Sequence, residues 1–424
     1  MFETFDNLKR FSLRIKTLSP VFILSGATEN YFIHGSSAYQ EEIEIKTDNL
    51  KTDELKELAL NLLENLDSGK SLLGKNLAKY IKVKRKRELE CICCKESEQE
   101  EPQEKQVKLA IRLYENGSSR IAIPATTIKG MLRRLYLNEL LKRIENHEAF
   151  LEDLKTKYAL MLKKEKRFKP YACTKWESLK DVYQSKPGIP DHLMKKLASP
   201  IELLLLTSDA ENYENDVGKH KRDFQPKYIV DPHSDVFRFI KVKPVSNTIP
   251  ENQAKIYHLC RVYKNTGHQV RGINIFAEGI PENHTFEFEI ILGMNICDQC
   301  FSIQAHADNI KRRYGIEYSP LQFFKDFADG KINHTARIGF GAGFDSKVLD
   351  REALKSILSG VNDESLSKSN EDPVKNAEHL LFCLKELTSL EPKTEYRLCC
   401  EGSKGNNFGK VNLILENKNH AGAG

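Results

Sequence analysis

Short stretches in which apolar and polar residues alternate, separated by helical patterns, constrain this chain more than any other feature. The clearest lies at the start, where Phe11, Leu13 and Ile15 alternate with polar residues, as expected of a half-buried strand. Further on, two more strand patterns flank an Asn116-Gly117 turn and predict a hairpin. Hairpins with interspersed helices favour an α+β architecture with antiparallel sheets over a doubly wound parallel sheet.

The length of the chain sets its domain organisation. Its 424 residues suit two to three domains or one elaborated domain. A βαββαβ unit, the ferredoxin-like motif, fits both halves of the sequence. We therefore expect two ferredoxin-like (RRM-like) domains with helical insertions. The first would cover residues 1–225, and the second, residues 226–424, would carry a glycine-rich loop.

Composition excludes several classes of protein. The chain has 65 Lys and Arg against 60 Asp and Glu, a formal charge of +5, so any nucleic-acid site must come from local clustering. The longest apolar stretches, Ile201–Leu206 and Leu380–Leu384, are far shorter than the ~18 residues of a membrane span. The N-terminus has no basic and apolar signal pattern, and the ten cysteines form no regular framework. We expect a cytoplasmic protein.

A glycine cluster near the C-terminus is the first candidate binding element. Arg337-Ile-Gly-Phe-Gly-Ala-Gly-Phe-Asp-Ser-Lys347 matches neither the dinucleotide fingerprint nor the Walker A loop. Glycines at a spacing of two still let the backbone approach a ligand closely and turn N–H groups toward phosphate oxygens. The two phenylalanines would stack on bases or pack the loop against the core. The candidate RNA-binding residues here are Arg337, Gly339, Gly341, Gly343 and Lys347.

A strand-to-helix junction is the second candidate. A strand ends at Pro124, and a helix is expected over Ile128–Arg143, with a threonine hydroxyl capping its free N–H groups. Three basic residues stand in the first turns, two of them four residues apart and so on one face. Together with the helix N-terminus they would form a phosphate site; the alternative is an ordinary solvated surface helix. The candidate residues are Thr126, Thr127, Lys129, Arg133 and Arg134.

Two other clusters favour structural interpretations. The basic run Lys82–Arg87 is interpreted as a solvated helix face rather than a contact to a nucleic-acid backbone. Cys297 and Cys300 form a C-x-x-C pair, but a tetrahedral zinc site needs four ligands and no H-x₃₋₅-H partner follows. Buried thiols are favoured over a zinc module, and no metal or cofactor is expected.

Hydrolytic catalysis has little support in the sequence. His34, His233, Asp231 and Asp235 are the acid/base candidates, but none of the known hydrolase motifs accompanies them. The segment around His233 is rich in turn-forming residues, which favours a surface loop. No catalytic residue is therefore assigned.

The order of these motifs resembles a known family. Thr17-Leu-Ser-Pro20 after the first strand, Ile123-Pro-Ala-Thr-Thr-Ile-Lys-Gly-Met-Leu-Arg133, and the glycine cluster from Arg337 to Lys347 are similar to segments of the RAMP superfamily of CRISPR-associated proteins. Within it, the length and the glycine cluster look most like the fifth Csm subunit of type III-A effector complexes. Ala125-Thr126-Thr127 stands where that family usually has Gly-Ser-Ser.

The resemblance implies a non-catalytic RNA-binding subunit in antiviral defence. Such a subunit caps the filament of backbone RAMP subunits and holds the 3′ side of the CRISPR RNA (crRNA). It also supports crRNA 3′-end maturation, through a trimming nuclease of the host. The loop Gly26–Asn30 lacks the aspartate that target-cleaving backbone subunits carry. The alternative is a metal-independent RAMP endoribonuclease that processes precursor crRNA, with His34 or His233 as general acid or base.

Overall fold

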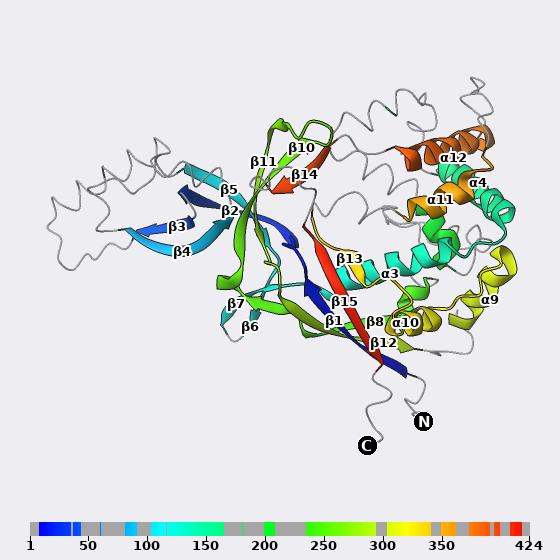
Figure 1. The fold of residues 1–424 in the computed structure, drawn as a ribbon, viewed down its shortest axis with the longest axis horizontal. Helices are drawn as coiled ribbons and strands as arrows, with labels where there is room; N and C mark the ends of the chain where they lie inside the picture. The colour runs from blue at the N-terminus through cyan, green and yellow to red at the C-terminus, as the bar shows by residue number, and fades with distance from the viewer. Residues whose placement is uncertain are drawn as a thin grey trace, which may run out of the picture.

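The computed structural model of the chain (Figure 1) combines largely antiparallel sheets with a helical layer, which confirms the α+β class; the parallel pairs are β4–β10 and β5–β11. It describes residues 8–34, 37–43, 60, 81–90, 103–115, 117–164, 180, 199–207, 235–293, 303–340, 349–361, 373–390, 394–398 and 408–417.

One sheet unites strands from both ends of the chain. Its five strands are antiparallel throughout, and β1 is the central strand. Leu13 of β1 faces Phe288 on one side and Leu415 on the other, so residues some 400 positions apart pack as neighbours. In spatial order the strands are β13 (Thr335–Arg337), β15 (Lys410–Asn417), β1 (Leu8–Thr17), β12 (Thr285–Gly293) and β8 (Ile240–Ser246).

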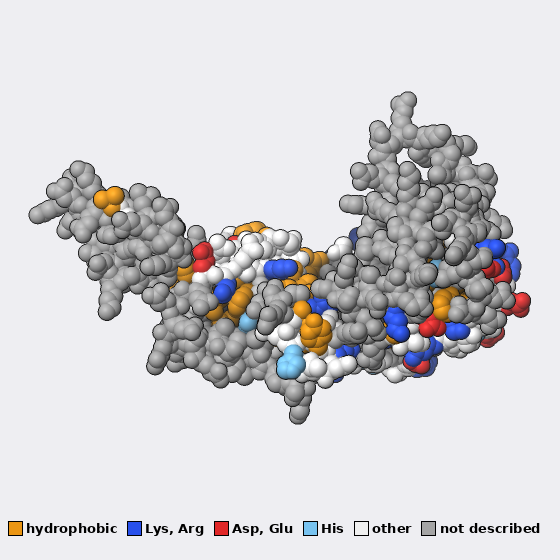
Figure 2. Space-filling view, turned by 90° about the horizontal axis from the view of Figure 1, so that it is seen from above, with side chains coloured by type: hydrophobic (Ala, Val, Ile, Leu, Met, Phe, Trp, Pro, Cys, Tyr) orange, Lys and Arg blue, Asp and Glu red, His pale blue; other side chains and the backbone are white. Residues whose placement is uncertain are grey.

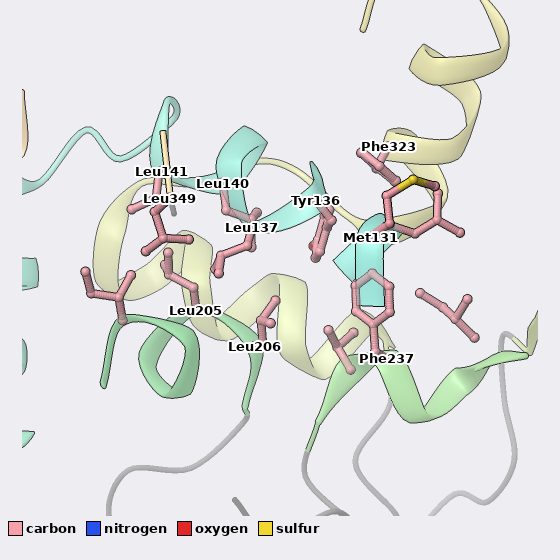
Figure 3. Packing of buried hydrophobic residues seen from close by; sticks show 14 of the residues in the cluster. Met131, Tyr136, Leu137, Leu140, Leu141, Leu205, Leu206, Phe237, Phe323 and Leu349 are labelled. Atoms are coloured by element: carbon pink, nitrogen blue, oxygen red, sulfur yellow. The ribbon is translucent and has the colours of Figure 1, made fainter. Parts of the chain in front are cut away.

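Helices cover one face of this five-stranded sheet. Every second residue of β1, β12 and β15 is buried in the same apolar cluster as the helices, whereas the residues between them remain accessible, as the pleat of a strand requires. Figure 3 shows α3 lining this core with Met131, Tyr136 and Leu137. The helices are α3 (Ala125–Leu141), α4 (His147–Lys164), α9 (Ile303–Tyr314), α10 (Pro320–Ala328), α11 (Arg351–Leu358) and α12 (Pro373–Ser389), with a further helix at 199–206 and the 3₁₀ turns η3 (Val236–Phe239) and η4 (Glu251–Gln253).

A second, seven-stranded sheet curls on itself. Because β11 pairs with both β5 and β10, six of its strands form a closed ring, and β14 adds to β10 outside the ring. Its own apolar cluster includes Tyr31, Val107 and Ile256. The order is β11 (Gln269–Gly279), β5 (Gln103–Ala110), β2 (Leu24–His34), β3 (Ser37–Ile43), β4 (Ile81–Glu90), β10 (Lys255–Tyr263) and β14 (Thr394–Leu398). A small third sheet joins β6 (Arg112–Glu115), β7 (Ser118–Ala122) and β9 (Thr248–Pro250).

Several local predictions need correction. Residues 82–87 lie in strand β4, so the helical interpretation of that basic run is wrong. The expected loop at residues 25–30 belongs to β2, whose pairing with β5 shifts register between Leu24 and Thr28. That irregularity explains the loop-like sequence, because a bulge inserts an unpaired residue into a strand. The predicted β6–β7 hairpin is confirmed.

The boundary expected between residues 225 and 226 does not separate the sheets. The five-stranded sheet takes β1 from one side of it and four strands from the other. The seven-stranded sheet likewise mixes β2 to β5 with β10, β11 and β14. Division of the chain into two folding units at this position remains a prediction, but the hydrogen-bonded sheets cross it.

Candidate nucleic-acid interface

The first turn of α3 begins directly after β7. The N-cap is Pro124, no side chain caps the helix, and its first turn contains no acidic residue. The expectation that a threonine caps the helix is therefore wrong: Pro124 occupies the cap, so both threonines fall inside the first turn. Thr126 is exposed, and Thr127 and Lys129 are half-buried. Among the described hydrogen bonds, the N–H of Thr127 donates to the Pro124 carbonyl, while those of Ala125 and Thr126 have no acceptor, which leaves donors for an anion.

The two arginines of the predicted site are already paired. The guanidinium of Arg133 binds Glu202 and also Asp235, the latter at 3.1 Å. Arg134 lies 3.6 Å from Glu202. Asp235 is itself held in place, because its other oxygen accepts the N–H of Phe237 at 2.8 Å at the start of η3. These arginines therefore tie α3 to the 199–206 helix and to η3, and a phosphate would have to compete with two carboxylates for them.

The surroundings of Lys129 and Arg133 shift their pKa values in opposite directions. Burial acts to lower the pKa of Arg133, but the attraction of Asp235 and Glu202 outweighs it, so the pKa is raised. Burial lowers the pKa of Lys129, and the more distant Asp235 offsets it only in part. Burial also lowers the pKa of Arg134. Among the three predicted cations, Lys129 has no ion-pair partner in the described part of the chain, so it is the cation best able to accept an incoming phosphate.

Gly339 is needed for internal packing. Its φ is +90°, a region that favours glycine, and an added Cβ would lie 2.4 Å from the Phe22 carbonyl oxygen. The next N–H, that of Phe340, donates to that same oxygen at 2.7 Å. The close backbone approach expected at this glycine is therefore made to the protein's own chain. Arg337 donates to the Phe408 carbonyl at 3.3 Å.

Two half-buried aromatic rings and a lysine meet where the glycine-rich segment begins. The ring of Phe340 lies 5.5 Å from that of Tyr396 on β14, and the ammonium of Lys108 on β5 lies 5.3 Å from the Phe340 centroid. We call Lys108, Phe340 and Tyr396 the aromatic corner. A cation lies over each ring, Lys108 over Phe340 and Arg261 over Tyr396 at 5.7 Å. Partly exposed rings beside cations are the combination that binds single-stranded nucleic acid without reading its sequence.

A series of backbone hydrogen bonds connects the aromatic corner to the start of α3. Phe340 is hydrogen-bonded to Phe22, the next residue Ile23 accepts the N–H of Ile111 at 2.8 Å, and Ile111 accepts that of Ala122 at 2.9 Å. Ala122 is two residues before the N-cap of α3. The two predicted elements, more than 200 residues apart in sequence, are thus joined through three hydrogen-bonded segments.

The structure describes few of the remaining candidates. Gly341, Gly343 and Lys347 lie outside the described residues, as do His233, Asp231, Cys297 and Cys300. His34 ends β2, where its backbone pairs with Ser37, and Asp235 is engaged with Arg133. Among the described residues, no group of three or more His, Cys, Asp or Glu side chains could hold a metal.

Sequence reasoning missed Lys108 and Tyr396. Each sits on a strand of the seven-stranded sheet, and only the pairing of β14 with β10 and of β5 with β11 brings them to Phe340. Glu202 was missed for a related reason, because its partner Arg133 is 69 positions away. None of these residues carries a local signal of its role.

Comparison with known proteins gives a structural likeness. No family model and no curated protein matches the sequence. The chain is similar to one in the cryo-EM structure of a Csm-crRNA-target RNA ternary complex in a type III-A CRISPR-Cas system. The TM-score is 0.43 and the identity 15%, over 96% of this chain and 100% of that chain. Among the described helices, none is both long and apolar enough to cross a membrane.

Proposed function

We propose that this chain is a non-catalytic RNA-binding subunit of a type III-A CRISPR effector complex, acting in the cytoplasm. The observation that carries the proposal is the hydrogen-bonded connection between the aromatic corner and the start of α3, which links two aromatic rings and Lys108 to Lys129 and to helix N–H groups that have no acceptor among the described hydrogen bonds. Contacts of this kind hold a ribose-phosphate strand without reading bases. Sequence would be read by pairing between guide and target.

The family motifs supply the finer part of the proposal. In this scheme the chain caps the filament of backbone subunits, holds the 3′ side of the crRNA, and supports trimming of the 3′ end by a host nuclease. The five-stranded sheet supports a ferredoxin-like unit in this chain. With β1, β8, β12 and β15 numbered one to four, their spatial order is 4-1-3-2, and helices follow the first and third, as in a βαββαβ unit.

The test measures the affinity of the purified chain for a repeat-derived crRNA over a salt series. Lys129→Gln should flatten the slope of log K against log salt by roughly 0.7, the value of one phosphate contact on a single strand. Lys129 is the suitable target, because replacing Arg133 would remove the ion-pair partner of Asp235 and one of the two partners of Glu202, and so disturb the fold. Lys142→Gln, at the other end of α3, is the matched control and should leave the slope unchanged.

A second variant tests the aromatic corner. Tyr396→Leu keeps an apolar side chain of similar size but removes a ring, so it should weaken binding by the ~1–3 kcal/mol of one stacked base. If wild type binds no RNA, the proposed function is wrong. Discrete, metal-free cleavage of the repeat RNA, lost in His34→Ala, would replace it with the endoribonuclease alternative.

A further inference from the structure

The face of the five-stranded sheet that the helices leave uncovered carries an excess of basic side chains. We call this surface, formed by the outward residues of its five strands, the open face. On β1 the buried residues alternate with Arg10, Ser12, Arg14 and Lys16, and the register of the neighbouring strands fixes which of their residues point the same way. The basic residues are Arg10, Arg14, Lys16, Lys241, Lys243, Arg337 and Lys410; the acidic ones are Glu287, Glu289 and Glu416.

The carboxylates of the open face are largely matched by its arginines. Arg10 lies 3.4 Å from Glu289, and Arg14 pairs with Glu416. By contrast, four exposed lysines have no carboxylate partner in the described part of the chain. We call Lys16, Lys241, Lys243 and Lys410 the open-face lysines. The positive excess of this surface therefore resides in its lysines.

These lysines lie in two zones at opposite ends of the sheet. In the first zone, Lys16 faces Asn412 of β15. Lys410 lies two residues before Asn412 and pairs with Arg337 on β13. Lys241 and Lys243 lie on β8 beside Ile291 and Glu289, at the level of Arg10. Lys16 lies six positions after Arg10 on β1, so the two zones are about 20 Å apart at the ~3.3 Å rise per residue of an extended strand. The paired carboxylates lie between them.

We infer that the open face binds the phosphate backbone of single-stranded RNA, as a surface additional to the start of α3 and the aromatic corner. The inference rests on the proposed function for the class of ligand. Charge complementarity favours a polyanion, and lysine and glutamate are both depleted in protein–protein interfaces, which favours RNA over an acidic protein. The described open face carries no aromatic side chain, so contact is electrostatic, independent of sequence and strongly weakened by salt.

The helical side of the molecule offers the contrast. Figure 2 shows Lys and Arg side chains next to Asp and Glu at the helical end. The ion pairs of the helical side include Lys311–Glu317 and Lys355–Glu352. The same number of cations can therefore be removed from exposed helical positions, two of which, Lys311 and Lys355, are each paired with a glutamate.

The test compares two variants that each lose four positive charges. Lys16→Gln/Lys241→Gln/Lys243→Gln/Lys410→Gln removes the open-face lysines. Lys311→Gln/Arg312→Gln/Lys325→Gln/Lys355→Gln is the control, from α9, α10 and α11. With a uridine oligonucleotide of about 15 nucleotides, the open-face variant should flatten the salt slope by roughly 2 to 3, at 0.7 for each contact, and the control should not. Thermal melting verifies that both variants fold, as expected for exposed positions.

A footprint gives an independent readout on the wild-type chain. Bound RNA should lower acetylation of the open-face lysines by N-hydroxysuccinimide acetate and leave that of Lys325 unchanged. Equal slopes for the two variants, or equal protection of Lys325, would overturn the inference. So would competition by polyglutamate as strong as that by RNA of equal charge, because it would point to an acidic protein partner. If Lys129→Gln flattens the slope while the open-face variant does not, the inference fails and the proposed function stands.

Discussion

The two faces of the five-stranded sheet have opposite chemistry although the same strands build both. On β12, Phe288 is fully buried under the helices, and its neighbour Glu289 points to the open face beside Arg10. The covered face holds the fold together through apolar contact, whereas the open face holds charge in water. Stability should therefore depend on the covered face and the helices that pack on it, and RNA affinity on the open face.

The largest effect is expected from Phe288→Ala. Truncating a fully buried phenylalanine costs about 3–5 kcal/mol of unfolding free energy, from lost transfer energy and the cavity left behind. Glu289→Ala, one residue away, should cost less than about 1 kcal/mol, because its ion pair with Arg10 is partly exposed to water. Denaturant titration of both variants measures the difference. Equal losses would contradict the assignment of the two faces.

The next effect is a pH dependence that originates in the helical layer. His306 on α9 is fully buried, and burial lowers its pKa to about 4 from an ordinary value of 6.5. Between these values the unfolded chain binds a proton that the folded chain does not, so the free energy of unfolding falls as the pH drops from 6.5 toward 4, by at most about 3 kcal/mol. His306→Gln should remove this component. Melting curves of both proteins across that range would reveal it, and parallel curves would exclude it.

A smaller contrast separates two arginines. Arg133, about three-quarters buried, binds Glu202 and Asp235, while Arg14 on the open face pairs with a single exposed glutamate. Arg133→Ala should destabilise the chain by about 2 kcal/mol, because it removes the ion-pair partner of the partly buried Asp235 and leaves Glu202 with Arg134 alone. Arg14→Ala should cost less than about 1 kcal/mol. Chemical unfolding measures the difference between the two variants. An Arg133 variant as stable as the Arg14 variant would show that the ion pairs of Arg133 with Glu202 and Asp235 do not stabilise the fold.

Local patterns in the sequence predicted the elements of the fold better than their partners. Alternation identified β1, and the Asn116-Gly117 turn identified the β6–β7 hairpin, because both signals lie within a few residues. The pairing of β1 with β15 joins residues some 400 positions apart, and no local pattern encodes it. The basic run of β4 was misassigned because charge alone does not distinguish a helix from a strand.

The candidate site divides in the same way. Thr126 and Lys129 stand where the strand-to-helix pattern placed them, in the first turn of α3. The sequence did not reveal that Glu202 and Asp235 engage Arg133, or that Gly339 packs on Phe22, because these contacts arise only from the tertiary fold. The lysines of the open face were visible as the polar half of strand alternation, but which of them share a surface depends on register.

The most direct test of the account is photo-crosslinking of the intact chain to a 4-thiouridine-containing RNA, followed by mapping of the crosslinked peptides. We expect crosslinks in β1, β15 and the aromatic corner, and their loss at high salt. Crosslinks confined to α9, α10 and α12, on the helical side, would contradict it.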